Sequence, residues 1–263
     1  MCKIKIYFFR IFVLFVTFTT CQHAQAATFH SILIGDTDDE ILKKVAKKDM
    51  LNMSNHMQNI CNALDTVEKF QQSTYVGRRV DVTILEDLKN LEIGTDDIVF
   101  LYYSGHGFNT KQNQSQIWPY IYFNHGDIGI NSPDIVEILM QHQPRLVICF
   151  IDCCNNILKP KDFPNFFEKE ANIDGLTFAK SNKAKNLRKL FQETNGLILI
   201  AGAAPGYYSE GTDRKGSCFT NVYLRIFNDL VKSSEDASWE EILSQAQQQL
   251  WKRQHPYYEL HID

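Results

Sequence analysis

The stretch VFLYYSGHGF at residues 99–108 begins as an apolar run and ends abruptly at His106, which lies between two glycines. The stretch LVICFIDCCNNI at residues 146–157 repeats this design and ends at two adjacent cysteines, the second of which is Cys154. A run that is apolar at consecutive positions is typical of a strand buried on both faces of a parallel sheet. Functional groups gather beyond the carboxyl ends of such strands, so we expect His106 and Cys154 to converge if the two strands are neighbours.

Strand and helix patterns alternate along the rest of the chain. Further strands are predicted at residues 29–36, 79–85 and 196–205, and a weaker strand or hairpin at residues 117–124. Helices are predicted at residues 49–64, 132–142, 185–194, 219–231 and 239–251. This alternation predicts an α/β fold with a mostly parallel central sheet and helices on both faces.

Four single residues refine these elements. Pro119 argues against a central place for its strand, because proline cannot donate to the ladder. Asp49 suits the N-terminal end of the first helix, where a negative charge is favourable. Ser132 suits the N-cap of the second helix, with Pro133 at its first position.

The first 26 residues read as a secretory signal peptide. MCKIK is a positive n-region, residues 11–20 form an apolar run too short to span a bilayer, and AQA precedes a cleavage point after Ala26. An uncleaved anchor extended through residues 7–9 is the alternative; a lipoprotein signal at Cys21 is disfavoured by Phe18. We therefore expect residues 27–263 to form a single domain that is secreted or periplasmic, with no stable membrane insertion after leader removal.

Composition narrows the classes of function. The formal charge of −4 offers no basic surplus for nucleic acid, and 263 residues with 44% hydrophobic side chains suffice for one sizeable core. Of seven cysteines, the leader removes Cys2 and Cys21. The number of cysteines that remain is odd, so at least one thiol is not paired in a disulfide within the chain. Cys61 and Cys149 lie in apolar patterns and are predicted to be core residues.

The residues at the two strand ends suit acyl transfer. A thiolate attacks a carbonyl well, and a nearby imidazole can deprotonate the thiol and later protonate the leaving amine. The resulting oxyanion needs donors aimed at it. Gly107 has no side chain, so its N–H can approach that oxygen closely, and the N–H of Cys154 is the natural second donor.

The motifs YYSGHG and FIDCCNN together resemble the caspase-like cysteine peptidases, most closely their metacaspase and bacterial caspase-homologue branch. DMLNM at residues 49–53, GSCFTNVYL at residues 216–224 and the stretch at residues 190–209 extend the resemblance over nearly all of the mature chain. It implies a caspase-like three-layer sandwich and an endopeptidase with a Cys/His dyad. In that branch the histidine lies in Tyr-Ser-Gly-His-Gly and the nucleophile in Asp-x-Cys, which correspond to His106 and Cys154.

The neighbours of Cys154 leave two questions. The Asp-x-Cys register favours Cys154 over Cys153 as the nucleophile; since adjacent residues in an extended stretch point oppositely, Cys153 is expected to pack backward as a small apolar residue. Many metacaspases continue with His-Ser-Gly, whereas this chain has Asn155 and Asn156, and some bacterial relatives carry Arg-Asn-Asn. This departure bears on the geometry of the loop.

Asp152 indicates the substrate class. Classical caspases carry Gln at this position and bind an acidic P1 side chain, whereas a carboxylate at the floor of the S1 pocket favours Arg or Lys. By the resemblance, Asp49 is the second acid of that pocket. The alternatives are a turn-stabilising role in local hydrogen bonds for Asp152 and a helix N-terminal charge for Asp49.

Other functions are less well supported. A catalytically inactive caspase homologue acting as a binding module is the main alternative to the enzyme. An α/β hydrolase needs a nucleophile elbow that DCCNN does not supply. Zinc held by His106, Cys153 and Cys154 lacks a fourth ligand, so no metal or cofactor is expected. The resemblance leaves calcium activation open, and also the choice between a metacaspase-like monomer and a caspase-like dimer.

Residues 155–195 form a candidate intersubunit-type linker that is rich in lysine and weak in periodic pattern. Long segments of this kind are usually functional or disordered. If the S1 pocket is acidic, self-cleavage between Lys169 and Lys185 is a hypothesis, with a chain that is active uncut as its alternative.

Overall fold

The computed structural model describes residues 27–65, 67–110, 117–157 and 182–263. The predicted leader and most of the hypothetical self-cleavage segment, including Lys169, lie outside the described residues, whereas Lys185 lies in a helix. None of the described helices combines the length and apolar character that a membrane crossing requires.

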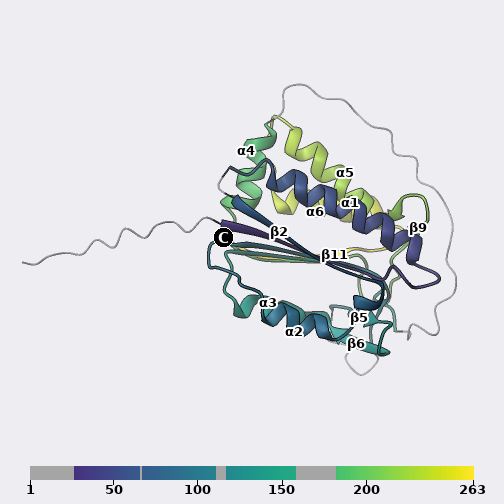
Figure 1. Cartoon of the computed structure of the whole chain (residues 1–263). Helices are drawn as coiled ribbons and strands as arrows, with labels where there is room; N and C mark the ends of the chain where they lie inside the picture. Colours follow the sequence, from purple (N-terminus) through teal and green to yellow (C-terminus); the bar gives the residue numbers. More distant parts are fainter. Residues whose placement is uncertain (1–26, 66, 111–116, 158–181) are drawn as a thin grey trace, which may run out of the picture.

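A six-stranded sheet forms the middle layer (Figure 1). Its strands, in spatial order, are β11 (Tyr257–Ile262), β8 (Gly196–Ala201), β7 (Leu146–Asp152), β3 (Ile98–Ser104), β1 (Ala27–Gly35) and β2 (Val67–Val76). All neighbours pair in parallel except β11, which is antiparallel to β8. The mostly parallel sheet is thus confirmed.

Helices cover both faces of this sheet, which confirms the three-layer architecture (Figure 1). One face carries α1 (Lys43–Cys61), α4 (Lys183–Leu187) with a π-helical turn (Arg188–Gln192), α5 (Cys218–Lys232) and α6 (Trp239–Leu250). The other carries α2 (Thr83–Lys89) and α3 (Ser132–Gln141). Two separate apolar clusters fill the spaces between the layers.

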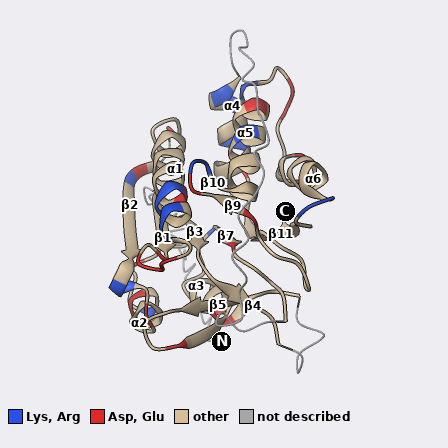
Figure 2. Cartoon of the chain, turned by 90° about the vertical axis from the view of Figure 1, so that its right-hand side faces the viewer, with Lys and Arg blue, Asp and Glu red and all other residues tan. Residues whose placement is uncertain are grey.

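Two small sheets lie where the parallel strands end. β4 (Gly107–Phe108), β5 (Tyr120–Phe123) and β6 (Ile128–Asn131) form one, and β9 (Gly211–Thr212) with β10 (Gly216–Ser217) forms the other. Figure 2 looks onto this edge and shows β4 and β5 on one side of β3 and β7, with β9 and β10 on the other. Pro119 precedes β5, outside the main sheet, as predicted.

The central strands are buried because their side chains are apolar on both faces. Every residue of β3 and β7 is buried. Phe150 of β7 contacts Tyr102, Phe219 and Tyr223 at ring-centroid distances of 5.3, 5.1 and 5.1 Å. This aromatic group joins β3 and β7 to α5.

The strand predicted at residues 79–85 is wrong. These residues span a short 3-10 turn (Gly77–Arg79) and the start of α2. Val80, Ile84 and Leu88 are buried at four-residue steps, which is helical spacing, and the short alternation concealed it. The actual second strand, β2, was missed because an edge strand of mixed burial lacks an apolar run; the edge strand β11 was missed for the same reason.

Two helix starts also differ from prediction. α1 begins at Lys43, so Asp49 lies inside the helix and its N-terminal role is wrong. The N-cap of α3 is Asn131 rather than Ser132, whose hydroxyl donates to the carbonyl of Pro119 at 2.5 Å. In both cases the side chain that was expected at a helix N-terminus instead forms hydrogen bonds with residues distant in the sequence.

We expect Phe150→Ala to lower the free energy of unfolding by about 3–5 kcal/mol, because it leaves a cavity among three aromatic rings. Leu51→Ala on α1 is the control: that side chain is 55% exposed, and the change should stay within about 0.5 kcal/mol. Chemical denaturation measures both. Equal effects would contradict this description of the core.

Candidate active site

β3 and β7 bring their ends to one rim. Ser104, the last residue of β3, pairs with Asp152, the last residue of β7. His106 and Cys154 therefore each lie two residues beyond a paired position. β3 and β7 are neighbouring strands, which confirms the condition under which His106 and Cys154 were expected to converge.

Gly107 shows that the two strand ends touch. A Cβ at this position would overlap Cys153 Sγ and lie 2.7 Å from the carbonyl oxygen of Cys154. Any larger residue would push the histidine segment away from the cysteine segment, so close packing requires glycine here, in addition to the oxyanion role predicted for its N–H.

The adjacent cysteines occupy different environments. Cys153 is buried in the apolar cluster of α2 and α3, as predicted, and burial raises the pKa of its thiol. Cys154 is partly exposed, and its Sγ lies 3.7 Å from the carbonyl oxygen of Ser209. Burial, opposed by this hydrogen bond, raises the pKa of Cys154 to about 12, so the group is a thiol at neutral pH.

The other described cysteines do not form disulfides. Cys61, Cys149 and Cys218 are free, like Cys153 and Cys154. Cys61 and Cys149 are buried core residues, as predicted from their apolar surroundings.

His106 is buried, and both its backbone and its ring have partners. Its carbonyl oxygen accepts from the hydroxyl of Tyr103 at 2.7 Å and from the N–H of Tyr122 at 3.0 Å. Its Nε2 lies 3.1 Å from Oδ2 of Asp39, a residue in the loop after β1 that sequence reasoning missed. The loop offers no apolar or motif signal by which Asp39 differs from its acidic neighbours.

Asp36, Asp39 and His106 form a compact polar group. One ligand-type atom from each lies within 4.8 Å of the others, which makes this the one set that could hold a metal ion in the described part of the chain. This group shares only His106 with the zinc site rejected from the sequence, and no cysteine takes part in it.

Asp152 is buried and bound by residues far away in the sequence. Its Oδ1 accepts from the Ser209 hydroxyl at 2.5 Å, and its Oδ2 accepts from the N–H and hydroxyl of Thr220 at 3.0 and 2.7 Å. These partners are 57 and 68 residues away, so the alternative of a local turn-stabilising role is wrong. Burial raises the pKa of the Asp152 carboxyl.

Asp49 is the second buried acid beside this strand end. Its Oδ1 accepts from the N–H of Ser217 at 2.8 Å, and its Oδ2 accepts from the hydroxyls of Ser217 and Ser104 at 2.5 and 2.8 Å. Burial and the negative charge of Asp152 raise the pKa of Asp49 to about 7. No cationic side chain forms an ion pair with either acid within the described ranges.

Asn155 ties the cysteine loop to its surroundings. Its side chain is buried, donates to the carbonyls of Ile117 and Ala203 at 2.8 and 3.1 Å, and accepts from Nδ2 of Asn109 at 2.9 Å. Its N–H also donates to the carbonyl of Tyr207 at 3.0 Å. Asn155, which departs from the pattern of many metacaspases, therefore holds this loop in place through its hydrogen bonds.

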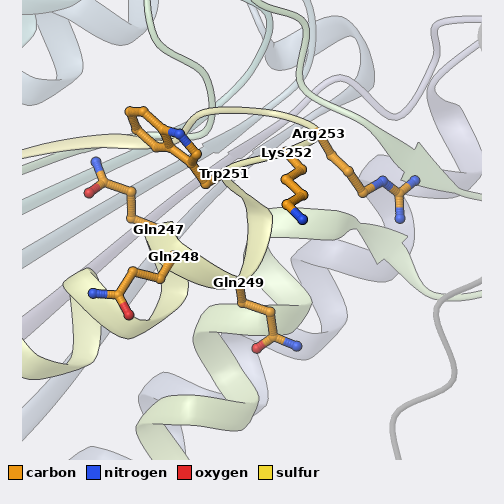
Figure 3. A pocket seen from close by; sticks show the side chains of 6 residues that line it. All are labelled: Gln247, Gln248, Gln249, Trp251, Lys252 and Arg253. Carbon is orange, nitrogen blue, oxygen red and sulfur yellow. The ribbon is translucent and has the colours of Figure 1, made fainter.

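A pocket lies elsewhere, at the end of α6 (Figure 3). It is lined by Gln247, Gln248, Gln249, Trp251, Lys252 and Arg253. This lining has no thiol, imidazole or carboxylate, so it lacks the groups that acyl transfer requires.

Comparison with known proteins adds one finding. A family model described as a caspase domain matches residues 37–262, which include both strand ends and both buried acids. No curated protein matches the chain.

We expect Asn155→Ala to lower the free energy of unfolding by about 1–3 kcal/mol, because it removes the hydrogen bonds of a buried side chain to the carbonyl of Ile117 and to the buried carbonyl of Ala203. Asn90→Ala is the control, since the Asn90 side chain bonds at the exposed end of α2. Denaturant titration gives the stabilities, and hydrogen exchange at residues 153–156 should accelerate only in the Asn155 variant. Unchanged exchange there would contradict the role of Asn155.

Proposed function

The chain belongs to the caspase-domain family, and we propose that it is a cysteine endopeptidase in which Cys154 is the nucleophile and His106 the base. A domain of this family is peptidase-like and acts on polypeptides. The observation that carries the residue assignment is the paired ending of β3 and β7, with Gly107 in contact with the cysteine segment.

In the proposed reaction, the Cys154 thiol gives its proton to His106 and its sulfur attacks the scissile carbonyl carbon. The carbonyl electron pair moves to oxygen, and the N–H groups of Gly107 and Cys154 stabilise that oxyanion. The oxyanion collapses as the C–N bond breaks, and His106 gives the proton to the leaving amine. Water then attacks the thioester carbonyl carbon in a second addition and elimination, which releases the carboxylic acid and restores the Cys154 thiol.

Cleavage after Arg or Lys is supported by the acid pair beside the nucleophile. Ser209 links the two sites, because its carbonyl contacts Cys154 Sγ and its hydroxyl bonds Asp152. A guanidinium in the S1 pocket would neutralise the carboxylates of Asp152 and Asp49, whose pKa values are raised chiefly by burial. An acidic P1 side chain would be repelled.

We expect Cys154→Ala and His106→Ala each to abolish peptidase activity, and Cys153→Ala to keep most of it, because Cys154 is partly exposed whereas Cys153 is buried. Fluorogenic peptides with Arg, Lys or Asp at P1, with and without calcium, measure the rates. Circular dichroism controls for folding. Equal loss in the Cys153 and Cys154 variants would overturn the nucleophile assignment, and an inert wild type would favour the binding-module alternative.

We expect Asp152→Asn to lower kcat/KM for Arg substrates about ten- to a hundredfold, through loss of a charge-assisted contact. Asp97→Asn is the matched control: that carboxylate is also buried, but it bonds Thr28 and His30 at the opposite end of the sheet. The control should alter stability without altering P1 preference. An unchanged Arg preference in Asp152→Asn would show that this acid is structural.

The acid pair also predicts a pH dependence of substrate binding. Asp49 is neutral below about pH 7 and ionised above it, so KM for Arg peptides should fall as pH rises from 6 to 8. Asp49→Asn should remove this fall, and peptides with a neutral P1 side chain should not show it. The same KM slope in the Asn variant would exclude Asp49 from the pocket.

A further inference from the structure

The ring of His106 faces a carboxylate that neither sequence motif contains. His106 Nε2 lies 3.1 Å from Asp39 Oδ2, and the two side chains are only 7% and 15% exposed. β1 and β3 are parallel neighbours that pair Gly35 with Ser104, so the loops carrying Asp39 and His106 leave the sheet side by side. The contact is therefore built into the sheet topology.

The second oxygen of Asp39 is anchored. Asp39 Oδ1 accepts from the N–H of Ile41 at 2.8 Å and from the N–H of Leu42 at 2.7 Å, just before α1. Burial acts to raise the pKa of Asp39, but the hydrogen bonds from His106 and Leu42 outweigh it and lower the pKa to about 2. The carboxylate is thus charged at neutral pH and held with one oxygen toward the imidazole.

Asn124 braces the same group from the end of β5. Its Nδ2 donates to Asp36 Oδ2 at 2.5 Å and to Asp39 Oδ2 at 3.3 Å. Because an amide N–H already points between the two acids, a metal ion there would have to displace a donor. The internal hydrogen bonds favour a positioning role for this group over a metal site.

We propose that Asp39 is the positioning residue of the catalytic imidazole, so that the site works as a Cys154–His106–Asp39 triad. This inference rests on the proposed peptidase function and extends it. Asp39 accepts a hydrogen bond from Nε2–H and thereby fixes the tautomer in which Nδ1 takes the proton from Cys154 Sγ. When Nδ1 is protonated, the Asp39 carboxylate stabilises the imidazolium until the proton passes to the leaving amine.

The first test is Asp39→Asn with an Arg-P1 peptide. The Asn side-chain oxygen can still accept hydrogen bonds from the N–H groups of Ile41 and Leu42. Its NH₂ group then faces Nε2, and this second donor disfavours the tautomer that is protonated at Nε2. We expect kcat to fall by about a hundredfold or more, with KM within about twofold. Asp39→Glu, which keeps the charge, should recover part of kcat. Asp38→Asn is the matched control, since Asp38 is an exposed neighbour, and it should keep wild-type kcat.

The second test needs no substrate. Iodoacetamide alkylation of Cys154 at pH 7, followed by peptide mass spectrometry, should slow about tenfold in Asp39→Asn and in His106→Ala. Alkylation of Cys218 serves as the internal control and should not change. If the wild type cleaves no peptide yet shows alkylation that depends on His106 and Asp39, the peptidase proposal fails while the positioning role of Asp39 stands.

The third test uses the wild-type protein, so it does not depend on the folding of a variant. Long-range ¹H–¹⁵N NMR should show neutral His106 protonated at Nε2; a ring protonated at Nδ1 would overturn the proposal. Wild-type kcat or Cys154 alkylation in Asp39→Asn would also overturn it. So would activity that is lost on dialysis against EDTA and restored by Zn²⁺ or Mn²⁺, since Asp39 would then act as a metal ligand.

Discussion

The parallel pairing of β3 with β7 is the constraint on which the rest of the structure depends. It aligns Ser104 with Asp152, so His106 and Cys154 each follow a paired residue by two positions in the sequence. A slip of one residue would turn every side chain of a strand to the other face and separate the two polar ends. The two apolar clusters bury the strands on both faces and oppose such a slip, with Phe150 and its aromatic neighbours in one of them.

Burial of the acid pair at this rim opposes folding when the two carboxyls are charged. The pKa of Asp49 rises from 3.8 to about 7 on folding, so the folded protein holds a proton that the unfolded chain has released in this window. Stability therefore falls as pH rises from about 4 to about 7. Hydroxyl and N–H donors from Ser104, Ser217 and Thr220 offset part of this cost. In the proposed function, a cationic P1 side chain supplies further compensation.

The segments that carry Cys154 and His106 are each held by partners from distant parts of the chain. Asn155 joins the cysteine loop to the segments of Asn109, Ile117 and Ala203, and Asp39 joins the histidine to the start of α1. The proposed geometry thus depends on side chains outside both motifs. This explains how a chain with Asn155 in place of the usual family residue can still order its cysteine loop.

The sequence by itself determined the central strands, the α5 and α6 helices and the rim that carries His106 and Cys154, because long apolar runs and regular spacing are local signals. The edge strands β2 and β11 were not predicted, because their half-exposed faces carry both polar and apolar residues. The pattern at residues 79–85 was too short to distinguish a strand from a helix. The partners of Asp49, Asp152, Asn155 and His106 were decided only by tertiary structure. A polar side chain has many donors or acceptors within its local sequence, and only the folded chain selects which distant group it meets.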